Sequence, residues 1–482
     1  MDKIIYASSV AKLDSDVYSG GGTDDTKALQ GLLDSAPGLG HLRVIMDGAA
    51  LVTGLKIHSN TTIECMDRDC GFFLADGSDC SVIENYDRDY FERKTKNIAL
   101  IGGTYNHNAK GQRHHCEVDD PSLLFGGPYN EALDMGGNRL VIAMEFYGVE
   151  NFLMRDLVIR NQRTWGLIVC NFKYVTIEGC RFDLPEKMHA QNQDGFHFWG
   201  PGQFLTIRDV GGRVGDDFMN IGPDEHDQKS DITDVLIDGV MLDEADQAIR
   251  MLSRGKGRLD RVTVRNVTGT YHGIGFYINQ WFPPNYGNFG NIVFENIDLR
   301  PKKPTYNPDC PFLFQLGGNI ESMSFKNIYH HFPEYRYNLF RIGYPFADQN
   351  YPIPPENRPN IKTLVIDGLH IEEYDDSTAD NDYILIRCPV ENMILRDVDV
   401  IRGGDVRPRG RMIKTLEGCE IGTLLVDRVY AKRMAEFIKA EHGSIERLIT
   451  HNIVADEFAG SFIESSEGVI KCAKERGNGV GE

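Results

Sequence analysis

A short pattern of alternating apolar and polar residues recurs along the middle and C-terminal parts of the chain. In each copy a charged residue, followed by a small or polar one, separates two apolar stretches, as in FLMRDLVI, IVFENIDL and MILRDVDV. The residues at the separating position are Asp156, Gly179, Asp209, Gly239, Asn266, Asn296, Asn327, Gly368, Asp397, Arg428 and Asn452. Alternation with a period of two, rich in β-branched and aromatic residues, indicates strands, and no helical period lies between the copies.

The spacing of the copies indicates a solenoid. The intervals between successive copies are similar, and the longest of them contains the proline-rich loop 350–360. Self-similarity at a period of about 20–50 residues is typical of solenoids, whereas a propeller needs four strands in about 40 residues and leucine-rich repeats need a leucine skeleton. Gly, Asn and Asp tolerate left-handed backbone angles, so each copy is expected to bend sharply between two strands. We therefore predict an all-β fold, a single right-handed parallel β-helix.

Few segments favour a helix. Residues 23–33, TDDTKALQGLL, have capping residues before an apolar period, which predicts a short helix that caps the N-terminal end of the solenoid. Residues 431–443 contain helix-forming residues but lie between two copies of the pattern, so we expect strand and loop there. Without a linker, we expect one domain over residues 1–482. It comprises an N-terminal cap at about 15–60, coils with the candidate site at about 150–300 and C-terminal coils at about 300–475.

Composition limits the partners. The 482 residues carry 51 basic and 71 acidic side chains, and the net charge of −20 argues against nucleic acid and anionic membranes. No apolar run is long enough to cross a bilayer, and the apolar run at the start is too short for a signal peptide. We therefore expect a cytoplasmic location, with a secreted or periplasmic one as the alternative if a signal peptide has been removed. The ten cysteines are scattered without metal-ligand spacing, and we expect no cofactor, no metal and mostly buried thiols.

Three aspartates are the strongest candidates for chemistry. Asp216 and Asp217 stand side by side in RVGDDFMNIG, and Asp194 precedes Asp216 by an interval close to one coil. They are therefore expected to cluster on neighbouring coils, where mutual repulsion keeps at least one carboxyl protonated. A protonated and an ionised carboxyl are the acid and the base that glycoside hydrolysis needs. The alternative is that these aspartates only cap a bend.

These motifs resemble glycoside hydrolase family 28, the polygalacturonases and their relatives. That family carries Asn-Thr-Asp-Gly, then Gly-Asp-Asp about one coil later, and here Asn192 to Gly195 and Gly215 to Asp217 are similar to them. The opening GGGTDDTKALQ and the segment 96–112 also resemble proteins of the wider pectin-lyase-like superfamily. The resemblance covers about residues 15–300. It implies a β-helix in which Asp216 is the general acid, Asp194 and Asp217 activate water, and the anomeric carbon is inverted.

The chain departs from the family where the substrate would bind. In place of Gly-His-Gly it has Gln247 near the histidine position, with Arg250 close by, and in place of Arg-Ile-Lys it has Tyr277 and Asn279. The family uses that Arg and Lys to hold the carboxylate of galacturonate, so their replacement favours a glycan other than plain polygalacturonate, unless nearby basic residues substitute. His197 stands where the family often has another carboxylate, and it either hydrogen-bonds the acid or is an ordinary strand histidine.

Further residues have two interpretations each. Trp165, Trp199, Tyr277 and Trp281 could form a platform for a sugar ring, or they could pack in the core. The run Asp224 to Asp227 lacks the spacing of a calcium loop, and we expect solvated surface there. Two other functions stay open beside a hydrolase with a carbohydrate substrate. One is a polysaccharide lyase or epimerase, which would be expected to need a basic proton acceptor, and the other is a glycan-binding β-helix without catalysis.

Overall fold

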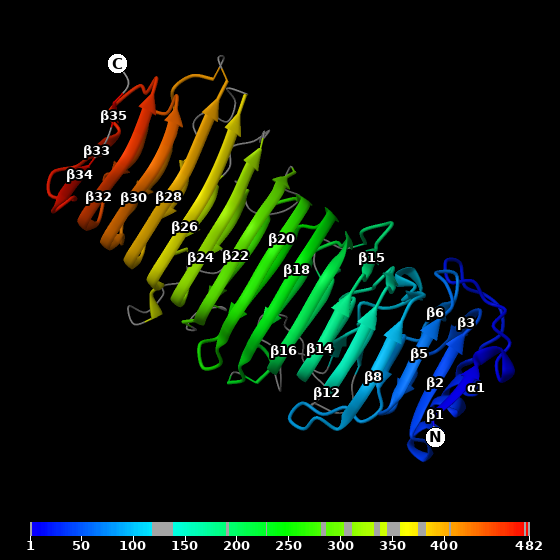
Figure 1. Ribbon diagram of the computed structural model, residues 1–482. Coiled ribbons are helices and arrows are strands. Elements are labelled where there is room, and N and C mark those ends of the chain that lie inside the picture. The colour runs from blue at the N-terminus through cyan, green and yellow to red at the C-terminus, as the bar shows by residue number, and fades with distance from the viewer. Residues whose placement is uncertain are drawn as a thin grey trace. The chain divides into compact units, whose positions relative to one another are not determined.

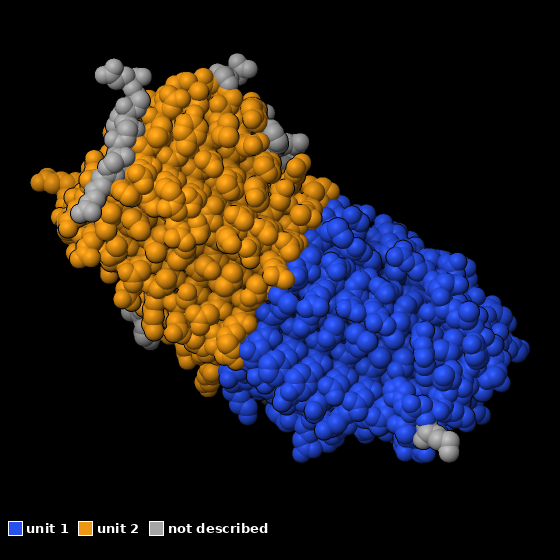
Figure 2. Space-filling model, viewed as in Figure 1, with its two compact units in different colours: residues 1–245 blue, residues 246–482 orange. Residues whose placement is uncertain are grey.

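The computed structural model describes residues 2–117, 138–188, 192–227, 229–280, 286–302, 311–331, 338–344, 357–374, 382–403, 406–476 and 479–480. The chain forms two compact units, residues 1–245 and residues 246–482, which Figure 2 shows in blue and orange. Each unit is a run of coils of a right-handed parallel β-helix, as the repeat predicts. The expected division into cap, site-bearing coils and C-terminal coils within one domain stays a prediction.

Unit 1 contains the single α-helix of the described residues and the first half of the strands. Its elements are β1 (Asp2–Tyr6), α1 (Thr26–Leu33), β2 (His41–Met46), β3 (Ala49–Val52), β4 (Leu55–Ile57), β5 (Thr61–Cys65), β6 (Gly71–Leu74), β7 (Ile83–Asn85), β8 (Thr95–Ile101), β9 (Thr104–Asn106), β10 (His115–Glu117), β11 (Asn138–Leu140), β12 (Met144–Arg155), β13 (Val158–Arg160), β14 (Leu167–Glu178), β15 (Arg181–Asp183), β16 (Phe196–Arg213), β17 (Asp217–Gly222) and β18 (Ile232–Glu244). Three short 3₁₀ turns span Ala7–Ser9, Ala36–Gly38 and Ala109–Gly111.

Unit 2 consists of strands alone in its described residues. They are β19 (Gln247–Ser253), β20 (Leu259–Tyr271), β21 (Ile274–Gln280), β22 (Asn288–Pro301), β23 (Phe312–Leu316), β24 (Asn319–His331), β25 (Asn338–Ile342), β26 (Asn360–Glu373), β27 (Asp382–Ile386), β28 (Pro389–Arg402), β29 (Arg411–Thr415), β30 (Glu420–Lys432), β31 (Glu436–Ala440), β32 (Ser444–Asp456), β33 (Ile463–Ser465), β34 (Ala473–Arg476) and β35 (Gly479–Val480). The expected strands around 431–443 are therefore confirmed, whereas most of the loop 350–360 lies outside the described residues.

Equivalent strands of successive coils pair in parallel and in register. In unit 1, β12, β14, β16 and β18 lie side by side (Figure 1), and Val175 of β14 is aligned with Phe152 of β12 and Leu205 of β16. In unit 2 the same arrangement runs from β20 through β22 and onward to β32. Each coil therefore contacts mainly the coil before and the coil after it.

The predicted bends are confirmed at every position. All eleven separating residues have left-handed backbone angles, with φ between 51° and 83°. In unit 2 three of these bends are also joined by side-chain hydrogen bonds, since Asn327 Nδ2 donates to Asn296 Oδ1 (2.9 Å) and Asn296 Nδ2 donates to Asn266 Oδ1 (3.0 Å). Arg428 adopts the same conformation although its long side chain gives no local preference for it.

Inward-facing side chains stack from coil to coil to form the core. In unit 2, Phe276, Phe314 and Phe340 are buried and occupy one register position of β21, β23 and β25. Their ring centroids are 4.7 Å and 5.0 Å apart in successive pairs. Burial of such a side chain contributes roughly 1.5–3 kcal/mol. The stack keeps the coils in register and so fixes the positions of the outward-facing residues between them.

The N-terminal helix lies where the pattern predicts it. Helix α1 is at the N-terminal end of unit 1 (Figure 1), where it buries Leu29, Leu32 and Leu33. The side chain of Gln30 bonds both the backbone N–H and the carbonyl of Lys56, at 2.8 Å and 3.1 Å, which anchors the helix to β4. Nine described cysteines are free thiols, and six of them are buried, as expected. Within the described ranges, no helix has both the length and the apolar character to cross a membrane.

Candidate active site

The strand register of unit 1 brings the two aspartate motifs together. Asp194 lies just before β16, and Asp217 is the first residue of β17. These strands pair in parallel with His197 opposite Asn220, and the Gly195 N–H donates to the carbonyl of Asp217 (2.8 Å). Because Asp194 and Asp217 each stand three positions before these paired residues, the two aspartates are aligned with each other. Asp216, the partner that the sequence spacing indicates for Asp194, instead precedes the strand.

The three carboxylates are buried, and that of Asp216 accepts a hydrogen bond from the backbone. Their exposed fractions are 3% for Asp194, 5% for Asp216 and 0% for Asp217. The backbone N–H of Asn192 donates to Asp216 Oδ2 (2.8 Å), and Asn192 reaches this position in a left-handed conformation, with φ of 66°. Asn192 thus contacts the candidate acid through its backbone. A carboxylate that accepts from a backbone N–H has its orientation fixed before any ligand arrives.

His197 belongs to the same cluster but contacts a different aspartate from the expected one. Its Nε2 lies 2.8 Å from Asp194 Oδ2, whereas we expected a bond to the acid, Asp216. The difference follows from the register, because His197 is on the strand that Asp194 precedes by two residues. Its imidazole ring also stacks on the indole of Trp165, with centroids 3.4 Å apart and planes 9° apart.

The tautomer of His197 is set by a chain of buried hydrogen bonds. Glu225 Oε2 accepts from Trp199 Nε1 (2.9 Å) and from Asn220 Nδ2 (3.1 Å), which fixes the orientation of the Asn220 amide. The same Nδ2 lies 3.3 Å from His197 Nδ1, so that nitrogen accepts and Nε2–H donates to Asp194. A neutral histidine with one defined proton therefore orients the Asp194 carboxylate.

The prediction of solvated surface is wrong for most of the run Asp224 to Asp227. Asp224, Glu225 and His226 are buried, with exposed fractions of 0%, 3% and 7%. His226 Nε2 contacts the carbonyl of Gly200 (2.8 Å), and burial lowers the pKa of its imidazole. Four consecutive charged or polar residues suggest solvent, but Glu225 and His226 find tertiary partners on β16, and the run itself gives no sign of them.

The residue types in the cluster could bind a cation, but their hydrogen bonds fit proton transfer better. Single ligand atoms of Asp194, His197 and Asp217 all lie within 4.8 Å of one another. A histidine that binds a metal must present a nitrogen lone pair to it. In the network described above, His197 Nε2 carries a proton toward Asp194 and Nδ1 accepts from Asn220, so the arrangement fits acid–base chemistry better than metal ligation.

The tryptophans near the cluster pack in the interior. Trp165 and Trp199 are 3% and 1% exposed and meet edge to face, with centroids 5.6 Å apart. They belong to a buried apolar cluster with Leu140, Ile142, Tyr147, Ile168 and Cys170. Of the two interpretations that the sequence left open for these two residues, core packing is therefore the one observed, and Trp165 supports His197 rather than offering an open face.

The remaining candidates belong to unit 2. Arg250 and Tyr277 are register neighbours on β19 and β21, and Tyr277 packs on Leu252 and Phe312. Asn279 is fully buried and its Nδ2 donates to the carbonyl of Tyr344 (2.9 Å), which is a structural contact. Gln247 begins β19 and is 8% exposed. Trp281 lies outside the described residues.

Sequence reasoning missed Asn220 and Glu225. A signal for Asn220 does exist, because it follows Asp217 by three residues, as His197 follows Asp194 by three. Parallel coils place such equivalent positions next to each other, so the repeated spacing predicts the His197–Asn220 contact. No comparable signal marks Glu225, whose partners Trp199 and Asn220 lie on two different strands.

Comparison with known proteins identifies the fold. No family model matches the sequence, and no curated protein matches it. Among solved structures, the chain is similar to the tailspike protein of the E. coli bacteriophage HK620 in complex with a pentasaccharide, with a TM-score of 0.50 and 10% identity over 95% of this chain and 80% of the other. It is also similar to a family 28 exopolygalacturonase from Yersinia enterocolitica (TM-score 0.45, 14% identity, 99% and 78% covered). A third is an exopolygalacturonase from Thermotoga maritima (0.43, 11%, 94% and 92%).

Proposed function

We propose that this protein is a glycoside hydrolase that cleaves a glycan by acid–base catalysis with inversion. Asp216 is the general acid, and Asp194 together with Asp217 holds and deprotonates the attacking water. The observation that carries the proposal is the buried cluster itself, in which Asp194 and Asp217 are aligned on paired strands and Asp216 adjoins Asp217. The resemblance of both aspartate motifs to those of family 28 adds support.

In the proposed reaction, Asp216 donates its proton to the glycosidic oxygen as the bond from that oxygen to the anomeric carbon breaks. Water attacks the same carbon from the opposite face and gives a proton to the Asp194–Asp217 pair. The two products are a sugar with a new reducing end and a free alcohol. The enzyme returns to its starting state when a proton passes through solvent from the pair back to Asp216.

His197 has a positioning role in this proposal. Its Nε2–H donates to Asp194 Oδ2. The stack on Trp165 and the hydrogen bond from Asn220 restrict rotation of the ring. A base held in one orientation avoids the reorganisation that would otherwise raise the barrier. Because the histidine is neutral, it orients the carboxylate without adding a positive charge that would weaken it as a base.

The substrate that we favour is a neutral glycan. In place of the two cations by which polygalacturonases hold galacturonate, the sequence has Tyr277 and Asn279, and Asn279 is buried and bonded to a backbone carbonyl. The net charge of −20 further disfavours a polyanionic substrate. The tailspike structure with its pentasaccharide is in line with glycan recognition by a β-helix.

The test compares the wild-type protein with Asp216→Asn on plant and bacterial oligosaccharides, with products read by mass, by reducing ends and by NMR of the anomer. Loss of a general acid lowers kcat by about 10²–10⁴-fold. Asp209→Asn is the matched control, because it removes the same charge at an exposed bend of β16. Wild-type turnover by Asp216→Asn on a cleaved substrate would disprove the assignment.

A second candidate is glycan binding without cleavage. It is favoured by the burial of the carboxylates, none of which is more than 5% exposed. It predicts an oligosaccharide that binds wild type and Asp216→Asn equally well and is cleaved by neither. A lyase would instead release an unsaturated product that absorbs in the ultraviolet, and such a product would rule out the hydrolase.

A further inference from the structure

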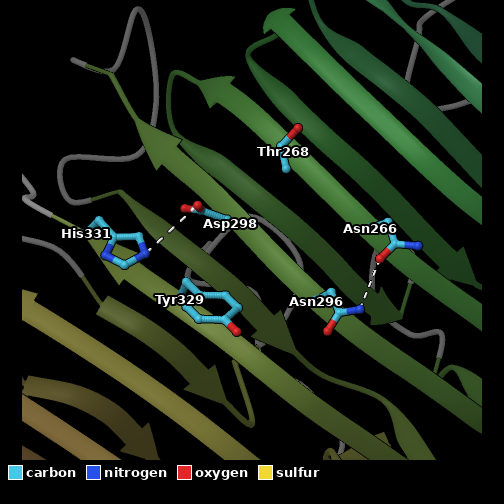
Figure 3. A pocket seen from close by; sticks show the side chains of 6 residues that line it. All are labelled: Asn266, Thr268, Asn296, Asp298, Tyr329 and His331. Atoms are coloured by element: carbon cyan, nitrogen blue, oxygen red, sulfur yellow. Dashed lines mark hydrogen bonds and ion pairs between the residues drawn. The ribbon is translucent and has the colours of Figure 1, made fainter.

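Three neighbouring strands of unit 2 border a small open pocket on the outside of the coils. Its volume is about 320 Å³, and its walls come from β20, β22 and β24 (Figure 3). The lining residues, which together we call the Tyr329 pocket, are Asn266, Thr268, Asn296, Asp298, Tyr329 and His331. The volume is at the lower end of the range for small-molecule sites, about 300–1,000 Å³.

The pocket arises from a step in side-chain size between adjacent coils. Thr268 and Asp298 are register neighbours with short side chains, whereas Tyr329 on the next strand carries a large ring. On the other side of β24, the Tyr329 ring stacks on His370 of β26, with centroids 5.0 Å apart and planes 21° apart. The Tyr329 ring also lies nearly parallel to that of His331, with centroids 5.7 Å apart and planes 17° apart. Since the pocket is lined by β20, β22 and β24, it lies on the side of β24 away from His370 and is bordered by these two rings.

Polar groups converge on this pocket from two walls. One wall is the row of asparagines at the bends, where Asn296 bonds both Asn266 and Asn327, so its amide is fixed in orientation. The other wall holds Asp298 and His331, whose Oδ2 and Nε2 atoms are 3.9 Å apart. His331 Nδ1 is also 3.6 Å from Glu372 Oε2, so two carboxylates flank the imidazole.

We propose that the Tyr329 pocket binds one neutral pyranose unit of a glycan. A flat aromatic face accommodates the C–H face of a pyranose, and fixed amide, carboxylate and hydroxyl groups at its edge suit sugar hydroxyls, which both donate and accept. The carboxylates of Asp298 and Glu372 disfavour an anionic sugar. This assignment does not depend on the proposed hydrolase, because all lining residues belong to unit 2 and lie at the bends marked by Asn266, Asn296 and Asn327.

The test uses the full chain carrying Asp216→Asn, so that cleavage does not interfere. Saturation-transfer NMR is recorded with the methyl glycosides of galactose, glucose and N-acetylglucosamine, and with galacturonate as the anionic comparator. We expect a neutral glycoside to bind and Tyr329→Ala to weaken its binding about tenfold. Tyr430→Ala removes an exposed tyrosine elsewhere in unit 2 and is the control, with no expected effect.

Two further variants show whether a loss of binding comes from the pocket or from misfolding of the variant. Tyr329→Phe keeps the ring and should keep binding, and Thr268→Trp should fill the pocket and abolish binding without altering Tyr329. The proposal is overturned if no neutral glycoside binds, if galacturonate binds more tightly than every neutral sugar, or if Thr268→Trp and Tyr329→Ala both leave binding unchanged. Thr268→Trp and Tyr329→Ala leave the aspartate cluster of unit 1 unchanged, so a loss of binding in them assigns the sugar to the Tyr329 pocket whether or not the hydrolase proposal holds.

Discussion

The imidazole of His197 lies flat on the indole of Trp165, with ring centroids 3.4 Å apart and planes inclined by 9°. Both rings are buried, and the two ring nitrogens of His197 face Asp194 and Asn220. The ring cannot rotate without breaking two hydrogen bonds and a stack. Through its two ring nitrogens, His197 therefore links Asp194, just before β16, to Asn220 on the neighbouring strand β17.

Replacing His197 by Phe should keep the stack on Trp165 and remove both hydrogen bonds. Without the Nε2–H donor, Asp194 loses its fixed orientation, and we expect kcat to fall about 10²-fold, as misplacement of a catalytic group does, with KM little changed. Steady-state kinetics on the substrate found in the screen measures this. His58→Phe is the matched control, because His58 stacks on Tyr86 and bonds Asp34 outside the cluster. Equal losses in both variants would contradict a specific role for His197.

Replacing Glu225 by Ala should destabilise unit 1. It removes the acceptor of Trp199 Nε1 and Asn220 Nδ2, and each buried donor left unpaired costs about 1–3 kcal/mol, so we expect a loss of at least about 2 kcal/mol. Urea unfolding followed by tryptophan fluorescence measures the free energy. Glu186→Ala, at an exposed carboxylate, should change it by less than about 0.5 kcal/mol. If both variants unfold at the same urea concentration, Glu225 does not hold this network.

Acid should weaken the fold through His107. Burial lowers the pKa of His107 to about 4, and its neutral ring bonds the carbonyl of Cys80 and the N–H of Arg163. Since the folded pKa is below the unfolded value of 6.5, this contribution to stability is complete above pH 6.5 and is lost as the pH falls toward 4. The full difference corresponds to about 3 kcal/mol.

The variant His107→Gln isolates that contribution, because a glutamine amide donates and accepts but does not titrate in this range. We expect its free energy of unfolding to depend less steeply on pH than that of the wild type between about pH 6.5 and 4. Urea titrations at several pH values in that window provide the comparison. Parallel curves for the two proteins would show that His107 is not the titrating group.

The left-handed bends should reverse the usual preference between alanine and glycine. At Asn327, with φ of 54°, alanine carries a steric cost of roughly 1–2 kcal/mol that glycine avoids, and both lose the bond to Asn296. We therefore expect Asn327→Gly to melt at a higher temperature than Asn327→Ala. At Ser324, on the same strand but not at a left-handed position, the order should be the opposite, because glycine costs more chain entropy. The same order at both sites would refute the argument.

The sequence predicts the coils better than the contacts between their outer side chains. Gly, Asn or Asp stands at all bends of the repeat except Arg428, so the sequence predicts them, whereas the bend at Arg428 is predicted only by the spacing of its neighbours. The sequence does not predict a second set of left-handed residues, which includes Tyr174, Phe204 and Arg261, because these side chains carry no local preference for that conformation.

The sequence predicts that three aspartates lie on neighbouring coils but does not predict their register, and their catalytic role stays a prediction. Asp194, Asp216 and Asp217 do gather in unit 1, but the pairing of β16 with β17 aligns Asp194 with Asp217 rather than with Asp216. A shift of one residue in the strand pairing would place the other aspartate opposite Asp194. The alternation of apolar and polar residues does not reveal how many residues form the turn between two strands, so it does not predict this pairing. The burial of Glu225 depends on tertiary partners and has no local signature.

The row of bends also bears on how such chains diverge. A few residues per coil must accept a left-handed backbone, and inward positions must remain apolar, but most outward positions only have to tolerate a strand. Substitutions can therefore accumulate over most of each coil while the path of the backbone persists. The same fold can therefore be built from very different sequences, as the likeness in fold to the tailspike at only 10% identity illustrates, and the spacing of bends is a better guide to this fold than aligned residues are.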